Sequence, residues 1–178
     1  VNLMENDFRV ERISVESNFI DLKYDGLNFG SKQLNLLSKV SENIQRLDLS
    51  NVDISDINSS KFKKLKNLKY LNLTNSNLST NDLNNLPESI EILILSKNII
   101  NPEELLNISS RPQIKKVFAY NTVQDNELKK SLTDQSNNKL YFGISLQDFS
   151  SLEGFPLERP IIEANGLEIN PNPITDIN

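Results

Sequence analysis

Two stretches near the middle of the chain carry the same apolar pattern. Residues 68–73 are Leu-Lys-Tyr-Leu-Asn-Leu, and residues 90–95 are Ile-Glu-Ile-Leu-Ile-Leu. In both, apolar residues occupy the first, fourth and sixth positions, and the last two alternate as in a strand with one buried face. Working outward, the pattern recurs at residues 44–49 and 114–119, where Ala119 is the weakest match. These four segments predict four equivalent short strands.

Two flanking segments extend the series to six units. Ile20-Asp-Leu22 and Phe142-Gly-Ile144 fit the end of the pattern, so the middle apolar residues fall at 20, 47, 71, 93, 117 and 142, with spacings of 27, 24, 22, 24 and 25 residues. A unit of this length cannot bury its own apolar face, but a stack of units can. The alternative is an ordinary parallel α/β sheet, whose crossovers rarely repeat at so constant a length.

The pattern resembles that of the leucine-rich repeat family over roughly residues 17–150. The resemblance implies an α/β solenoid, or horseshoe. About six short parallel strands would line its concave face, and short helices or 3₁₀ turns would form its convex face. The family's repeat includes an Asn that bonds the backbone of the turn, and only Asn98 fills that position here. The other units carry Asp25, Val52, Ser76, Thr122 and Gln147, and the expected substitutes one residue earlier are Asn51, Asn75 and Asn121.

Helix signals occur between the strands. Ser31 opens a segment with apolar residues at 34, 37 and 40, and Asp125 leads into Leu128 and Leu132. Asn101 is a typical N-cap, followed by a first-turn Pro and two acidic residues. The return over residues 82–87 is shorter and predicts a turn or two of 3₁₀ helix.

A run of lysines lies on another return segment. It comprises Lys61, Lys63, Lys64 and Lys66, interrupted by Phe62 and Leu65. With the two apolar side chains pointing inward, the run predicts a solvated helix face. A weak contact with a phosphate or an acidic partner is the alternative.

The two ends depart from the repeat. Residues 1–16, with Val10, Ile13 and Val15, are interpreted as an N-terminal cap containing a strand. Residues 17–150 form the repeat domain. Residues 151–178 are a C-terminal cap or a Pro-rich tail, with a possible hairpin over 161–169 around Asn165-Gly166.

Composition excludes several classes of function. The 178 residues contain no Cys and no His, which excludes thiol catalysis, Ser–His machinery and Cys- or His-ligated metals. The net charge of −5 argues against bulk binding of nucleic acid or an anionic membrane. No apolar run is long enough for membrane insertion. We expect no cofactor, no metal site and no catalytic residue.

The outward strand positions predict a binding surface. On the concave face, later units carry aromatic and aliphatic side chains that match the cores of protein interfaces. This candidate partner-binding patch consists of Tyr70, Ile92, Ile94, Phe118, Tyr120 and Tyr141. An alternative is that the C-terminal segment, through Ile161, Ile162, Leu167 and Ile169, or a second copy of the chain already covers the patch.

The first two units carry charges instead. Asp21, Lys23, Arg46 and Asp48 form a secondary polar surface, which we interpret as exposed ion pairs. Asp21 and Asp48 fall in the same column of the predicted sheet. Two neighbouring carboxylates can serve acid–base catalysis or a divalent cation, but an open sheet beside cations disfavours both roles.

The leading functional interpretation is a non-catalytic protein–protein interaction module that holds a protein partner on the concave face. Composition and resemblance also suggest a secreted bacterial effector acting in a host cell, which favours a cytosolic location, including a host cytosol, over an extracellular one. The alternatives are a substrate-recognition domain of a larger enzyme, such as a ubiquitin-ligase-like effector, and a structural protein that self-associates through the patch.

Overall fold

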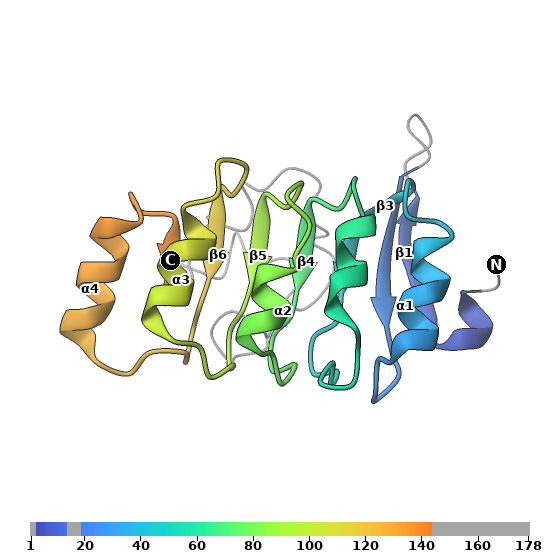
Figure 1. The fold of residues 1–178 in the computed structure, drawn as a ribbon, viewed down its shortest axis with the longest axis horizontal. Helices are drawn as coiled ribbons and strands as arrows, with labels where there is room; N and C mark the ends of the chain where they lie inside the picture. Colours follow the sequence, from blue (N-terminus) through green and yellow to red (C-terminus); the bar gives the residue numbers. More distant parts are fainter. Residues whose placement is uncertain (1–2, 14–18, 144–178) are drawn as a thin grey trace, which may run out of the picture.

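The computed structural model describes residues 3–13 and 19–143. Seven strands form one open sheet and follow one another in chain order, alternating with helices from β2 onward (Figure 1). The strands are β1 (Phe8–Ile13), β2 (Ile20–Tyr24), β3 (Ile44–Asp48), β4 (Tyr70–Asn72), β5 (Ile92–Ile94), β6 (Lys116–Phe118) and β7 (Leu140–Tyr141).

Six of these strands are parallel, as the repeat predicts. β2 to β7 pair in parallel, each with the next. β1 pairs antiparallel with β2 at the edge and contributes Phe8 to the core. It supplies the strand expected near Val10 and Ile13, whereas Val15 lies outside the described residues.

The helices cover one face of the sheet (Figure 1). They are α1 (Ser31–Ser38), η2 (Ser59–Lys64), α2 (Thr80–Asn84), α3 (Pro102–Ser109) and α4 (Asn126–Gln135), and the short helix η1 (Met4–Asn6) lies at the N-terminal end, before β1. One continuous core lies between α1–α4, η2 and the strands. It joins helix residues such as Leu37, Leu105 and Leu132 to strand residues such as Leu47 and Leu93.

The predicted caps begin the predicted helices. The side chain of Asn101 accepts a hydrogen bond from the Glu103 amide at 3.0 Å, and that of Asp125 accepts one from the Glu127 amide at 2.9 Å. The lysine run forms the short 3₁₀ helix η2, and Phe62 and Leu65 are buried as expected.

The prediction of 3₁₀ helix for the third return is wrong in type. α2 is a short α-helix that begins before the predicted segment. Ser79 and Asp82 bond each other's backbone amides at 3.2 and 2.9 Å, which is a capping box. This reciprocal pair satisfies two amide groups at the helix start and stabilises a full α-turn.

Asn98 does what the resemblance implies. Its Nδ2 donates to the carbonyls of Leu73, Leu95 and Ser96, and its Oδ1 accepts from the amides of Ser76 and Leu78, at 2.7–3.3 Å. One buried side chain thus joins two successive turns. At the equivalent position Ser76 donates to the Leu49 carbonyl at 3.0 Å.

The predicted substitutes for Asn98 have a different role. Asn51, Asn75 and Asn121 have φ angles of 59°, 50° and 59°. Asn tolerates this left-handed backbone better than most residues. These positions therefore provide the backbone reversal after each strand, rather than a side chain for the turn.

The predicted register is wrong at both ends of the sheet. Leu22, not Ile20, pairs with Leu47, and Leu140, not Phe142, pairs with Val117. Each error is a slip of two residues. Such a slip leaves every side chain on its original face, so apolar alternation alone cannot detect it.

Two further predictions concern other regions. The C-terminal segment 151–178, with its possible hairpin, lies outside the described residues. Over residues 3–13 and 19–143, no helix is long and apolar enough to cross a membrane.

Candidate functional site on the far face of the sheet

The sheet face opposite the helices, here called the far face, carries the predicted patch. Strand register arranges its side chains in columns across neighbouring strands. The first column contains Asp21, Arg46, Tyr70, Ile92 and Lys116. The second contains Lys23, Asp48, Asn72, Ile94, Phe118 and Tyr141.

The structure places five of the six patch residues on the neighbouring strands β4 to β7. Tyr70 pairs with Ile92, Ile94 pairs with Phe118, and the rings of Phe118 and Tyr141 are 5.3 Å apart. Tyr120 follows β6, and its amide donates to the Ser96 hydroxyl at 3.2 Å. Tyr141 belongs to the second column, beside Phe118, because of the register correction at β7.

Cations flank the aromatic rings. The Arg46 guanidinium lies 4.6 Å from the centre of the Tyr70 ring, and the Lys116 ammonium lies 5.1 Å from that of Tyr141. Both distances are within the range of cation–π attraction. The patch therefore has a mixed character: an apolar centre with positive charge at two of its rings.

The polar residues form ion pairs across the first strands. Asp21 pairs with Arg46 at 3.6 Å, and Lys23 pairs with Asp48 at 3.5 Å. The corrected register separates Asp21 and Asp48 into different columns, so the side-by-side carboxylates suggested by the sequence do not occur. The prediction of exposed pairs is also wrong, because both carboxylates and Arg46 are buried.

Burial of the far face is the main departure from expectation. Ile94 and Phe118 are 0% exposed, and Tyr70 is 9% exposed. None of the three belongs to the core between sheet and helices. Ile92, Lys116, Tyr120 and Tyr141 are partly exposed. The sequence pattern placed these residues on the correct face but predicted an open surface.

A charge ladder at the strand starts was missed by sequence reasoning. Glu91, just before β5, lies 2.6 Å from the Lys115 ammonium and 3.5 Å from that of Lys69. Burial opposes ionisation of Glu91, but the hydrogen bond and charge of Lys115, together with Lys69, hold its pKa below the ordinary value. The signal was available, since all three residues occupy the same position of successive repeats.

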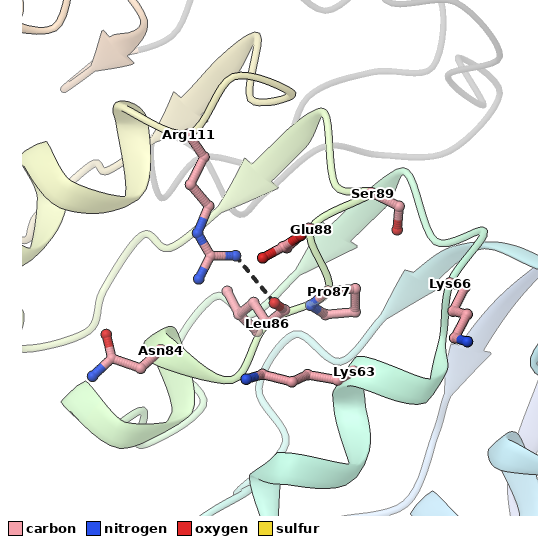
Figure 2. A pocket seen from close by; sticks show the side chains of 8 residues that line it. All are labelled: Lys63, Lys66, Asn84, Leu86, Pro87, Glu88, Ser89 and Arg111. Carbon is pink, nitrogen blue, oxygen red and sulfur yellow. Dashed lines mark hydrogen bonds between the residues drawn. The ribbon is translucent and has the colours of Figure 1, made fainter.

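A separate pocket of about 380 Å³ lies at the junction of η2, α2 and the turn after α3 (Figure 2). Arg111 reaches the carbonyls of Leu86 and Leu83 at 3.0 and 3.2 Å. Burial lowers the pKa of Arg111, and the charge of Glu88 opposes that effect. Lys63 and Lys66 also line the pocket.

This pocket has a structural explanation. Arg111 joins its own turn to the end of α2, and the hydroxyl of Ser89 donates to the Leu68 carbonyl at 2.6 Å. The guanidinium and the hydroxyl therefore both bind backbone. The lysine run contributes two cations here, and the alternative of a phosphate or acidic contact stays a prediction.

Within residues 3–13 and 19–143, no three acidic residues are grouped so as to hold a metal ion. Comparisons with known proteins add no assignment. No protein-family model matches the chain, and no curated protein is significantly similar to it.

Proposed function

We propose that the chain is a repeat solenoid of the leucine-rich-repeat type that binds a protein partner through the far face. One observation carries the proposal: five aromatic and aliphatic residues lie on four neighbouring strands, away from the core, and Tyr120 follows directly after one of these strands. Tyr and other large side chains dominate the energetics of protein interfaces. Because the patch residues lie outside the core between the sheet and the helices, they do not hold that core together.

The partly exposed residues indicate where a partner first makes contact. Ile92 and Lys116 lie in the column beside the buried pair Ile94 and Phe118, and Tyr141 is next to Phe118 on β7. Tyr120 follows directly after β6. Lys116 supplies a cation beside an aromatic ring. This arrangement fits a partner that presents apolar side chains together with a carboxylate.

Site-specific crosslinking tests the proposal. A photoreactive phenylalanine replaces Tyr120, and in a control chain it replaces Ile99, which is 99% exposed in the turn after β5. We expect a protein from a candidate lysate to crosslink at position 120 and not at 99. That protein is then purified and its affinity measured directly.

Alanine substitution makes the test quantitative. We expect Tyr120→Ala or Tyr141→Ala to weaken binding at least tenfold, as truncation of an interface hot spot does. Ile99→Ala should leave the affinity unchanged. Equal affinity for all variants, or crosslinking only between copies of the chain, would contradict the proposal.

A further inference from the structure

Four residues of the second column are buried on a face that no described helix covers. Asp48, Asn72, Ile94 and Phe118 are 8%, 2%, 0% and 0% exposed. All of α1 to α4 and η2 lie on the opposite side of the sheet (Figure 1). Neighbouring strands alone do not bury a face, as the partly exposed Ile92 and Lys116 in the next column demonstrate.

The composition of β5 agrees with a strand covered on both sides. Residues 92–95 are Ile-Leu-Ile-Leu, without a polar residue. A strand with one solvated face alternates apolar and polar residues, whereas a strand buried on both faces is continuously apolar. Val117, Phe118 and Ala119 repeat this character in β6 and beyond.

One segment of the chain has the length and position to supply the cover. Thirty-five residues follow Gly143, and β7, which immediately precedes them, places Tyr141 against Phe118. Strands are spaced about 4.8 Å apart, so β5 is about 10 Å from β7. Three or four extended residues span that distance.

The chemistry of that segment also matches. It contains the apolar residues Ile161, Ile162, Leu167 and Ile169. Six of its residues are acidic and one is basic, whereas residues 1–143 contain 18 acidic and 18 basic residues. The net negative charge of the protein is therefore confined to a segment that also carries apolar residues. On the far face Lys116 places a cation beside the Tyr141 ring, whereas the charges of Lys23 and Arg46 are balanced by Asp48 and Asp21.

We propose that residues 144–178 occupy the far face over β3 to β6. The inference deepens the proposed function, on which it rests, because the segment then competes with the partner for Ile94 and Phe118. Its acidic and apolar residues take the place of those that we expect in the partner.

The absence of native Cys allows a direct test with single thiols in the full chain. Three variants, Ile94→Cys, Leu93→Cys and Ile99→Cys, are reacted with a thiol reagent under native conditions. Ile94 and Leu93 are adjacent in β5 and face opposite sides of the sheet, so Leu93→Cys reports opening of the core. Cys is tolerated at buried apolar positions.

We expect Ile99→Cys to react at the rate of a free thiol and Ile94→Cys at least 100-fold more slowly. Adding Ile161→Asp and Ile162→Asp should accelerate labelling of Ile94→Cys at least tenfold and leave Leu93→Cys unchanged. Asn165→Asp, which adds charge without removing apolar surface, is the matched control and should have no effect.

Two results would overturn the inference outright. One is rapid labelling of Ile94→Cys in the chain with the native segment. The other is slow labelling of Ile94→Cys that has a different cause. In that case the slow labelling either persists when Ile161→Asp and Ile162→Asp are added, or is lost when the protein is diluted. Persistence would mean that residues other than Ile161 and Ile162 protect the thiol. Loss on dilution would mean that a second copy of the chain protects it.

A second measurement applies if the double Asp variant also exposes Leu93→Cys. A nitroxide is attached at Gly166→Cys in a chain that is otherwise native, and methyl signals are recorded by NMR. We expect broadening of Ile92 and Ile94 but not of Leu83 or Leu105, on the helix side of the sheet. Unbroadened Ile94 signals would refute the inference.

These experiments contain no partner, so they fail independently of the proposed function. Protection that is released by the Asp substitutions, with no crosslink at position 120, would leave the intramolecular cover standing and remove the partner. A crosslinked partner with an unprotected Ile94→Cys would do the reverse.

Discussion

Leu93 and Ile94 are consecutive residues of β5 that face opposite sides of the sheet, and both are fully buried. Leu93 belongs to the core shared with the helices, whereas Ile94 does not. The two side chains therefore report on two different packing interfaces within one strand.

Alanine substitutions of Leu93 and Ile94 should lower the free energy of unfolding by different amounts. We expect Leu93→Ala to lower the free energy of unfolding by about 2–5 kcal/mol, because it leaves a cavity in the core. Ile94→Ala should lower this free energy by less, because Ile94 lies outside that core. Urea denaturation followed by circular dichroism measures both, and equal losses would show that the far face belongs to the same cooperative core.

Removal of the Asn98 side chain should be costly. Asn98→Ala leaves three carbonyls and two amides of adjacent turns without this partner. Each buried group left unsatisfied costs about 1–3 kcal/mol, and partial relaxation limits the total. We expect a loss of about 3 kcal/mol by chemical denaturation. As a control, Asn67→Ala removes one exposed bond to the Glu42 carbonyl and should change stability by less than about 0.5 kcal/mol.

Backbone strain at Lys97 offers a stabilising substitution. Lys97 has a φ of 60°, in the left-handed region, at the turn after β5. Lys97→Gly relieves the steric cost of a Cβ there, and we expect a gain of about 0.5–1 kcal/mol. Lys97→Val should destabilise, because a β-branched residue is least compatible with this backbone. A thermal melt in which Val matches Gly would contradict the assigned conformation.

The charge ladder around Glu91 should make stability depend on pH. Its pKa is lowered in the folded state, so its contribution is present above the unfolded value near 4.5 and is lost as the pH falls through the lower folded value. We expect Glu91→Gln to cost about 1 kcal/mol at pH 7, and the difference from wild type to vanish at about pH 2. Denaturation curves across this range measure it.

Glu127→Gln provides the comparison for the ladder. Glu127 is 87% exposed, and its oxygen is 3.9 Å from Lys130. This substitution should have no measurable effect at either pH. A difference for Glu91→Gln that persisted unchanged in acid would contradict an electrostatic origin.

Burial should make the pair Asp21–Arg46 more strongly coupled than a surface pair. A double-mutant cycle with Asp21→Asn and Arg46→Gln should yield a coupling energy of about 1–3 kcal/mol. The pair Arg9–Asp25, at 3.2 Å but about half exposed, should yield less than about 1 kcal/mol in the same cycle. Equal coupling in both cycles would mean that burial does not strengthen the pair.

Much of the fold was predictable because the signals are local and repeated. Apolar residues at the fourth and sixth positions of each unit define the inner face of a strand, and Asn101 and Asp125 begin helices through their own side chains. The capping box of α2 is equally local, since Ser79 and Asp82 are three residues apart. Asn98 was predictable from the resemblance, and its five bonds confirm that role.

The sequence by itself determined the parallel strands of the repeat and the face on which each patch residue lies, because side-chain alternation has a period of two. That same period made the register of the end strands undecidable, since a slip of two residues preserves every face. Only the tertiary structure paired Asp21 with Arg46 and placed Tyr141 beside Phe118. It also decided that Ile94 and Phe118 are buried, because burial depends on what packs against a face, and alternation along a strand carries no information about that.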